Sequence, residues 1–317
     1  MRLIFLGSGA FALPTLRWLA GSEHEIRLVV TQPARPSGRG RKTTSTPVCA
    51  LANELGLETL EPEDVNAPEV VARLRSLDVQ LGLLVAFGQK LSSELLTSLP
   101  GGFINLHASL LPKLRGAAPI NWAILRGEQR TGCTVFRVVQ RMDAGPVLTA
   151  RSTEIKSEET AGELHDRLAE IGVETVEEAL RLYDGGTIPD GTLQDDEEAT
   201  HAPKIKKTDG FVRFDRPIAT VTTHIRAMTP WPGAAAQFRS ASGRWEKVMI
   251  VRARRAEGPA TPSSPPGTID ERSCVAALDG FVEILEIKPS SGRIMTWGDY
   301  VNGRHVEAGD SFVTPES

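Results

Sequence analysis

The chain has 317 residues, of which 40% are hydrophobic and 24% charged, with a formal net charge of -4; this composition suits a folded protein with room for two domains. No apolar run approaches transmembrane length, so no membrane partner is expected. The three cysteines, Cys49, Cys133 and Cys274, lack the even number and the spacing of a disulfide framework or a zinc site. Reduced thiols favour a cytoplasmic location.

The N-terminal half alternates apolar strand patterns with helical patterns. Strands are predicted at residues 3–6, 26–31 and 79–86, and helices at 13–19 and 48–55. Such alternation predicts right-handed parallel crossovers and an open, mainly parallel α/β sheet. Ligands of these sheets bind beyond the carboxyl ends of the strands. We therefore expect the functional site at that edge.

Two glycine-rich segments resemble nucleotide-binding motifs. Residues 7–12, GSGAFA, match the G-x-G-x-x-A fingerprint, so an NAD-dependent dehydrogenase is one alternative. The second strand of such sites ends in an acidic residue that holds the ribose, whereas here it ends in Thr31 and Gln32. Residues 38–43, GRGRKT, suggest a phosphate loop, but Arg41 stands where that motif requires glycine. The first glycines are therefore predicted to allow a close strand-to-helix turn, and NAD is not expected.

The segment FINLHASLLP at residues 103–112 carries the most informative polar residues. Side chains two residues apart on a strand share a face, so Asn105 and His107 are predicted side by side. A second strand at 134–139 leads to a turn that presents Asp143. An amide that binds an oxyanion, an imidazole that moves a proton and a carboxylate that orients the imidazole together suit acyl transfer. Asn105, His107 and Asp143 are the candidate catalytic residues.

The C-terminal part predicts a linker and a small β domain. Thr160 and Glu163 form a predicted capping box that opens a helix running to about residue 183. After a helix at 218–228, short strands broken by Gly and Pro predict a small β-barrel. The expected organisation is a catalytic domain at residues 1–188, a linker rich in Asp, Glu, Lys and Pro at 189–209, and a C-terminal domain at 210–317.

Basic residues cluster in three segments, each of which is either a solvated face or a contact for a polyanion. The clusters are Arg35, Arg39, Arg41 and Lys42; Lys204, Lys206 and Lys207; and Arg252, Arg254 and Arg255. The first lies in a segment with two glycines and two prolines, which is predicted to project as a loop. Histidines other than His107 have no partners at metal-ligand spacing, so no metal site is expected.

The block INLHASLLPKLRGAAPINW at residues 104–122 closely resembles the signature of the folate-dependent formyltransferases. Further segments place the resemblance in the branch that acts on the initiator methionyl-tRNA. They are TQPARPSGRGRK at 31–42, HAPKIKKTDG at 201–210, RAMTPWPGAA at 226–235, PGTI at 266–269 and MTWGDYVNG at 295–303. The resemblance implies a Rossmann-like catalytic domain followed by a smaller OB-like barrel.

The resemblance also implies the reaction and its participants. A formyl group would pass from 10-formyltetrahydrofolate, the co-substrate, to the α-amine of methionine on the initiator tRNA, for initiation of translation. The implied folate-binding residues are Ser109, Leu110, Leu111 and Pro112, with Ala86, Phe87 and Gly88 as weaker candidates. The implied tRNA-binding residues are Arg39, Arg41, Lys42, Lys204, Lys206 and Lys207, with Arg39 as the principal contact. A monomer that needs neither metal nor nicotinamide is expected.

The chain departs from the family pattern in three places. The first turn is Ser8-Gly9-Ala10 where bacterial relatives commonly have Thr-Pro-Asp or Thr-Pro-Glu, and Ala34 replaces a usual acidic residue. The run of acidic residues at 195–198 puts negative charge near the expected path of the tRNA.

Three other functions are also compatible with these residues. A formyltransferase acting on a sugar amine would share the three candidate catalytic residues but would not need the basic loop. A formyltetrahydrofolate hydrolase would share the same core. A folate-binding or RNA-binding module without catalysis would have no need to keep all three residue types in register.

Overall fold

The computed structural model describes residues 1–37, 42–183, 189–257 and 262–315. Its contacts divide the chain into two compact units. Unit 1 comprises residues 1–119, 130–154 and 165–202, and unit 2 comprises residues 120–129, 155–164 and 203–317. The first part of the segment expected as a linker thus groups with the N-terminal unit. The domain boundaries drawn from the sequence stay a prediction.

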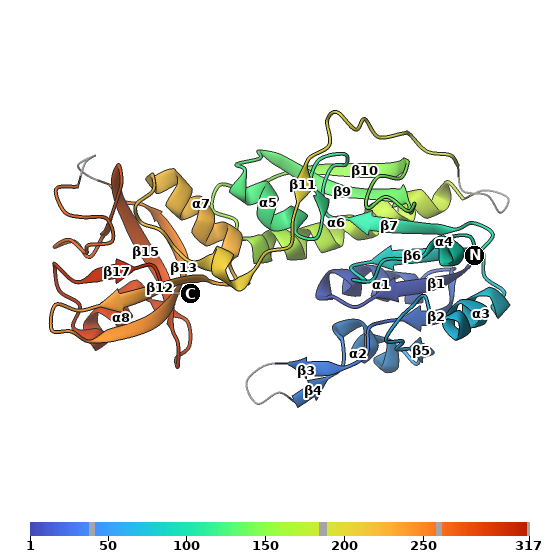
Figure 1. Cartoon of the computed structure of the whole chain (residues 1–317), viewed down its shortest axis with the longest axis horizontal. Helices are drawn as coiled ribbons and strands as arrows, with labels where there is room; N and C mark the ends of the chain where they lie inside the picture. Colours follow the sequence, from blue (N-terminus) through green and yellow to red (C-terminus); the bar gives the residue numbers. More distant parts are fainter. Residues whose placement is uncertain (38–41, 184–188, 258–261, 316–317) are drawn as a thin grey trace. The chain divides into compact units, whose positions relative to one another are not determined.

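Unit 1 is built on a seven-stranded sheet with the order β10-β9-β7-β6-β1-β2-β5 (Figure 1). The strands from β7 to β5 pair in parallel, whereas β9 and β10 are antiparallel additions. The strands are β1 (Arg2–Gly7), β2 (Glu25–Val30), β5 (Thr59–Leu60), β6 (Leu81–Val85), β7 (Phe103–His107), β9 (Arg130–Arg137) and β10 (Val147–Glu154). The prediction of an open, mainly parallel α/β sheet is confirmed.

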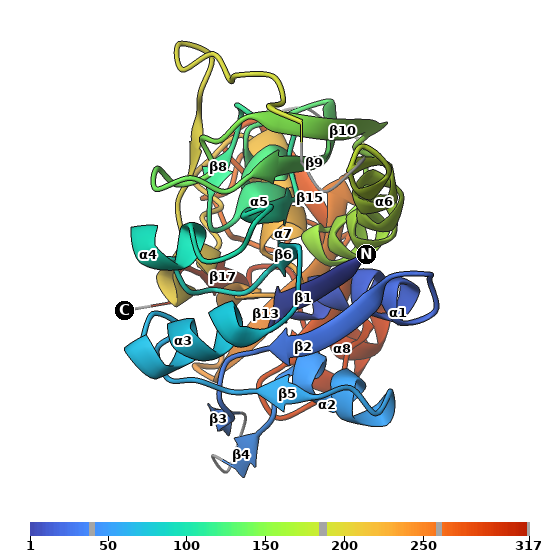
Figure 2. The ribbon, with the colours of Figure 1, turned by 90° about the vertical axis from the view of Figure 1, so that its right-hand side faces the viewer.

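Helices cover both faces of this sheet, with α1 and α6 on one face and α3 and α4 on the other (Figure 2). Phe103 of β7 belongs to the apolar cluster that packs on α3 and α4. Leu106 faces α6, and a Cβ atom at Gly172 of that helix would lie 2.6 Å from its Cδ2 atom, so glycine permits the close approach. The helices of this unit are η1 (Ala10–Ala12), α1 (Leu13–Ala20), α2 (Pro47–Glu54), α3 (Pro68–Ser76), α4 (Ser93–Leu96) and most of α6 (Ala161–Arg181).

Side chains fix where two of these helices begin. The predicted capping box of α6 is confirmed, because the Thr160 N–H donates to Glu163 Oε2 at 2.9 Å and the Glu163 N–H donates to Thr160 Oγ1 at 3.3 Å. Thr46 Oγ1 accepts the Cys49 N–H at 3.0 Å at the start of α2. Caps of this kind stabilise a helix by about 1 kcal/mol.

Two segments expected to be irregular contain short strands. The expected projecting loop at 31–42 includes β3 (Arg35–Ser37), which pairs antiparallel with β4 (Lys42–Thr44). The expected linker includes β11 (His201–Ala202), which pairs in parallel with β8 (Arg115–Gly116), and it ends in η2 (Lys207–Gly210). Strands of two or three residues are too short to leave an alternating pattern in the sequence.

Unit 2 is a nearly closed antiparallel sheet with the strand order β14-β15-β13-β12-β17, and β16 pairs with β15. Isolated bridges from Thr268 to Ser311 and from Ile269 to Val275 link its two edges. Besides η2, its elements are most of α5 (Pro119–Leu125), α7 (Ile218–Met228), β12 (Ala234–Arg239), β13 (Trp245–Arg255), β14 (Val275–Ala277), β15 (Gly280–Pro289), β16 (Met295–Thr296), α8 (Trp297–Arg304) and β17 (Ser311–Val313). The predicted barrel and the predicted helix at 218–228 are confirmed.

Candidate functional site

The carboxyl end of β7 carries Asn105 and His107. The His107 ring is buried, and its Nε2 atom lies 2.9 Å from the carbonyl oxygen of Leu114. Because a carbonyl oxygen can only accept a hydrogen bond, Nε2 carries the hydrogen. Nδ1 is therefore the ring nitrogen that is left to exchange a proton.

Asp143 approaches that second nitrogen. Its Oδ2 atom lies 3.9 Å from His107 Nδ1, which is within ion-pair range but longer than a hydrogen bond. The same oxygen accepts a hydrogen bond from the Gly116 N–H at 2.8 Å. Asp143 has a φ of 50°, a left-handed conformation that costs an L-residue about 1 to 2 kcal/mol. The structure thus brings His107 and Asp143 together and holds the carboxylate in a defined place.

Asn105 is half-buried and lies opposite Leu84 in the register between β6 and β7. It shares its face of β7 with Phe103 and His107, since the three alternate along the strand. No hydrogen bond of the Asn105 amide is found within the part of the chain that the structure describes. An amide at the edge of the sheet with free N–H groups can donate to a developing oxyanion.

The loop after β7 contains the predicted folate-binding residues Ser109 to Pro112. Ser109 is buried, and its hydroxyl donates to the carbonyl oxygen of Lys113 at 2.7 Å, while its own carbonyl accepts from Thr134 Oγ1 at 2.7 Å. Its polar groups therefore shape the loop. Leu110, Leu111 and Pro112 are only half-buried, so they are the members of this set with surface left for a ligand.

Residues 86–88 leave β6 beside His107, because Val85 pairs with Leu106 in the register between β6 and β7. Ala86 and Gly88 are exposed and have φ values of 48° and 85°, whereas the Phe87 side chain is buried. Ala86 and Gly88 are thus the members of this set with surface left for a ligand.

The first glycine-rich turn is used within the protein. The N–H groups of Ser8 and Gly9 both donate to the Ala86 carbonyl at 3.2 Å. The Gln32 amide donates to the Phe87 carbonyl at 2.8 Å, and the Gln32 N–H donates to Ser8 Oγ at 3.0 Å. These bonds join the ends of β1, β2 and β6, so the glycines serve a close turn as the sequence indicated.

The structure describes only some of the predicted tRNA-binding cations. Arg39 and Arg41 lie outside the described residues, and Lys42 begins β4. Lys204, Lys206 and Lys207 are exposed in unit 2, and no ion pair of their ammonium groups is found among the described residues.

The other basic cluster is largely neutralised. Arg252 pairs with Glu163 and Glu286, and Arg254 pairs with Glu283. This cluster therefore offers less free positive charge to a polyanion than its sequence indicated.

Sequence reasoning missed a buried cation beside the site. Arg115 is only 2% exposed, and its Nη1 lies 2.8 Å from Asp196 Oδ1. Its Nε and Nη2 donate to Gln194 Oε1 at 3.1 and 2.8 Å. Hydrogen bonds from Arg115 and then Arg141 hold the pKa of the Asp196 carboxyl below its ordinary value. Asp196, one of the four acidic residues at 195–198, therefore pairs with arginines of its own unit. The sequence did mark Arg115, as a cation inside the family signature block at residues 104–122. No sequence pattern marked Gln194.

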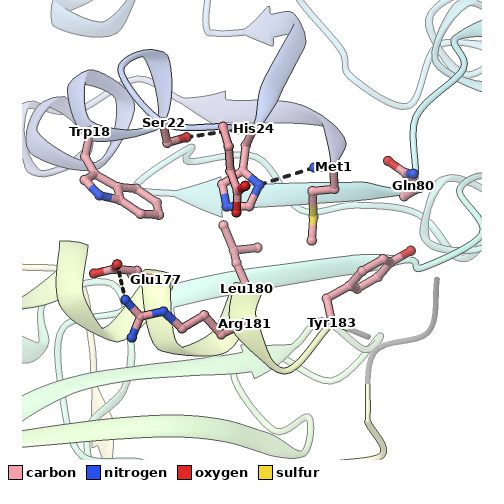
Figure 3. A pocket seen from close by; sticks show the side chains of 10 residues that line it. Met1, Trp18, Ser22, His24, Gln80, Glu177, Leu180, Arg181 and Tyr183 are labelled. Atoms are coloured by element: carbon pink, nitrogen blue, oxygen red, sulfur yellow. Dashed lines mark hydrogen bonds and ion pairs between the residues drawn. The ribbon is translucent and has the colours of Figure 1, made fainter. Parts of the chain in front are cut away.

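A cavity of about 630 Å³ lies at the opposite edge of the sheet, near the amino ends of β1, β2 and β6. Figure 3 shows Trp18 and His24 on one side of it and Glu177, Arg181 and Tyr183 on the other. Glu177 and Arg181 form an ion pair, and burial is the main reason why the pKa of His24 is lowered. No predicted site residue lines this cavity.

Within the described ranges, no three His, Cys, Asp or Glu side chains lie close enough together to hold a metal ion. Of the helices that the structure describes, none is both long and apolar enough to cross a membrane.

Solved structures with a similar fold include formyl-transferring proteins. HypX from Aquifex aeolicus, in complex with tetrahydrofolic acid, superimposes with a TM-score of 0.64 at 20% identity, over 97% of this chain and 48% of the HypX chain. This chain therefore spans about half the length of HypX. WlaRD, a sugar 3N-formyl transferase with dTDP and 5-N-formyl-THF, gives a TM-score of 0.63 at 15% identity, over 92% of this chain and 99% of WlaRD. At these identities the likeness shows the fold alone.

Sequence comparisons cover both units. Residues 1–180 match the family described as formyl transferase, and residues 204–305 match its C-terminal domain. The methionyl-tRNA formyltransferase of Solibacter usitatus is 39% identical over 308 residues, 96% of this chain and 96% of the relative. That of Geotalea uraniireducens is 40% identical over 309 residues, 98% of this chain and 97% of the relative. By this similarity along nearly its whole length, the chain belongs to the methionyl-tRNA formyltransferase family.

Proposed function

We propose that this protein transfers the formyl group of 10-formyltetrahydrofolate to the α-amine of methionyl-tRNA, releasing tetrahydrofolate and supplying N-formylmethionyl-tRNA for initiation of translation. The observation that carries the proposal is the identity of 39% to a methionyl-tRNA formyltransferase over 96% of both chains. The ordered His107 and Asp143 pair at the carboxyl edge of the sheet supports it, because ligands of such sheets bind there.

The chemistry needs an oxyanion site and a proton carrier. The neutral amine attacks the formyl carbon, a C–N bond forms, and the carbonyl electrons move to oxygen. We assign the Asn105 amide and a protonated His107 to stabilise that oxygen. When the intermediate collapses, the bond from carbon to N10 of the folate breaks, N10 takes a proton, and the amine nitrogen gives one up.

Nδ1 of His107 is assigned the proton transfer, because Nε2 donates to the Leu114 carbonyl. A proton on Nδ1 creates an imidazolium 3.9 Å from the Asp143 carboxylate. The carboxylate lies next to the positive charge that forms there, and contacts of this length commonly shorten when a substrate is bound. Asp143 thus orients and charges the imidazole, and its bond to the Gly116 N–H keeps it in place.

The folate is assigned to the loops after β6 and β7. Leu110, Leu111 and Pro112 have half-buried apolar surface for the ring system, and the exposed residues Ala86 and Gly88 lie at the end of β6, where the pterin edge can contact them. Ser109 keeps its assignment as a residue of the binding segment, acting through the shape of the loop.

The tRNA is assigned to the basic segment around Arg39, Arg41 and Lys42 and to the exposed Lys204, Lys206 and Lys207. Exposed lysines and arginines bind a polyphosphate by releasing counterions. We further propose a monomer that acts in the cytoplasm. The three cysteines are free and buried, which suits a reducing compartment.

The test offers the purified protein 10-formyltetrahydrofolate labelled in the formyl group, with methionyl-tRNA, a nucleotide-linked amino sugar or neither. Label in the aminoacyl-tRNA alone is the expected result. Label in the sugar would establish the sugar-amine alternative, and free formate without an acceptor would establish the hydrolase. Binding of folate or tRNA without turnover of either would leave a non-catalytic module.

A further inference from the structure

Gln194 connects the Asp143 turn to the loop that carries the other partner of His107. Its Nε2 atom donates to the carbonyl oxygens of Asp143 at 2.9 Å and Gly145 at 2.7 Å. Its Oε1 atom accepts two hydrogen bonds from the Arg115 guanidinium. An amide has two N–H groups and two acceptor positions, so all of them are used. A flipped amide would face carbonyls with its oxygen, and the orientation is therefore fixed.

Arg115 lies in β8, between the two residues that contact the site. Leu114 supplies the carbonyl that receives His107 Nε2–H, and Gly116 supplies the N–H that binds Asp143 Oδ2. Thr200 fixes the same loop, because its hydroxyl accepts the Leu114 N–H at 2.9 Å and its carbonyl accepts the Arg115 N–H at 2.8 Å.

The turn that Gln194 holds contains a backbone conformation that is unfavourable for an L-residue. Asp143 adopts a left-handed φ of 50°, which an L-residue keeps only when its surroundings impose it. The Gln194 amide binds the carbonyl of this residue and the carbonyl two residues later, on both sides of the bend. The buried guanidinium anchors the amide, because Arg115 is itself fixed by Asp196.

We infer that Gln194 is a positioning residue for the formyl transfer, which sets the distance between the Asp143 carboxylate and His107 Nδ1 by joining the Asp143 turn to Arg115. The inference rests on the proposed function, in which Asp143 orients and charges His107. Gln194 touches neither imidazole nor carboxylate, so it acts through Asp143. Without it, the turn relaxes and the carboxylate leaves the imidazole.

Two substitutions test this. Gln194→Ala removes all four hydrogen bonds, whereas Gln194→Glu keeps the acceptors for Arg115 and replaces the donors that face the two carbonyls. Each is expected to lower kcat by about tenfold to a hundredfold, since displacement of a catalytic group by about 1 Å has that effect, while KM for the folate changes by less than about threefold. The distance from the Asp143 carboxylate to His107 Nδ1, measured in crystal structures of both variants, should exceed the 3.9 Å of the unsubstituted protein.

Leu193→Glu is the matched control for the added charge, because Leu193 is adjacent and 82% exposed. It should retain the kcat of the unsubstituted protein. Thermal unfolding of each variant separates loss of positioning from loss of folding. If a folded Gln194→Ala or Gln194→Glu protein keeps its kcat and its distance between Asp143 and His107, the inference is wrong.

A double-variant cycle separates this inference from the proposed function. If Gln194 acts through Asp143, then adding Gln194→Ala to Asp143→Asn should lower kcat by less than about twofold beyond Asp143→Asn alone. Equal, multiplicative losses would show that Gln194 acts elsewhere and would overturn the inference. If Asp143→Asn alone leaves kcat unchanged, the proposed role of Asp143 fails instead.

Discussion

The Nε2 atom of His107 donates to the carbonyl oxygen of Leu114 at 2.9 Å, and this one hydrogen bond decides how the imidazole can act. It fixes the ring orientation and the neutral tautomer, and it leaves Nδ1 toward Asp143. Proton transfer and charge stabilisation must therefore both use Nδ1 of His107.

His107→Ala and Asp143→Asn should each lower kcat by about two orders of magnitude or more, the range for lost acid-base or oxyanion groups. Folate affinity should change far less, because neither residue belongs to the assigned folate loop. Single-turnover formylation and folate titration measure the two effects. His24→Asn is the control, since that histidine lines the cavity at the opposite edge of the sheet. Near-normal turnover of either variant would disprove the catalytic assignment.

Gly145→Ala should lower kcat by at least about tenfold through a shift of the Asp143 turn. A Cβ atom at Gly145 would lie 1.7 Å from the Arg137 carbonyl oxygen, so the backbone must move. Gly298→Ala is the matched control, because a Cβ atom there meets no atom within 4 Å. Steady-state kinetics of both variants provide the comparison. Equal kcat values would mean that the turn tolerates the displacement.

Arg39→Ala should weaken kcat/KM for methionyl-tRNA by roughly 1 to 3 kcal/mol if the guanidinium reads a base, and should flatten the salt dependence if it meets a phosphate. The expectation comes from four cations in eight residues of the sequence. Folate binding should be unchanged. Arg17→Ala removes one exposed cation elsewhere as the control. Superimposable salt curves for wild type and Arg39→Ala would show that the loop is only a solvated surface.

Glu163→Gln should reduce stability at neutral pH and have less effect in acid. The Thr160 N–H first, and then Arg252, hold the pKa of Glu163 below its ordinary value of 4.5. The ionised carboxylate therefore stabilises the folded state above the ordinary pKa, and that contribution is lost as the pH falls through the lowered value. The effect should be below about 1 kcal/mol, because the side chain is 47% exposed. Urea unfolding at pH 7 and pH 3.5 measures it, and an equal difference at both pH values would contradict the assignment.

The parallel core was predictable because strands such as β6, LGLLV, are continuous apolar runs, and helix α7 was predictable from its periodicity. The faces of Asn105 and His107 follow from the alternation of a strand. Gln194 was not predictable, since it lies in an irregular segment whose contacts are far away in the chain. The bond between Asp143 and the Gly116 N–H likewise depends on tertiary structure, which a local pattern does not encode.

Because Asp143 has a left-handed φ, the residue that gives the most stable protein at this position differs from the residue that gives turnover. Glycine adopts that conformation without the penalty of about 1 to 2 kcal/mol that an L-residue incurs. A library screened only for heat resistance should therefore enrich Asp143→Gly and accumulate robust, inactive proteins. A thermostable variant that keeps aspartate at this position has therefore been selected for catalysis as well as for stability, because selection for stability alone would replace it.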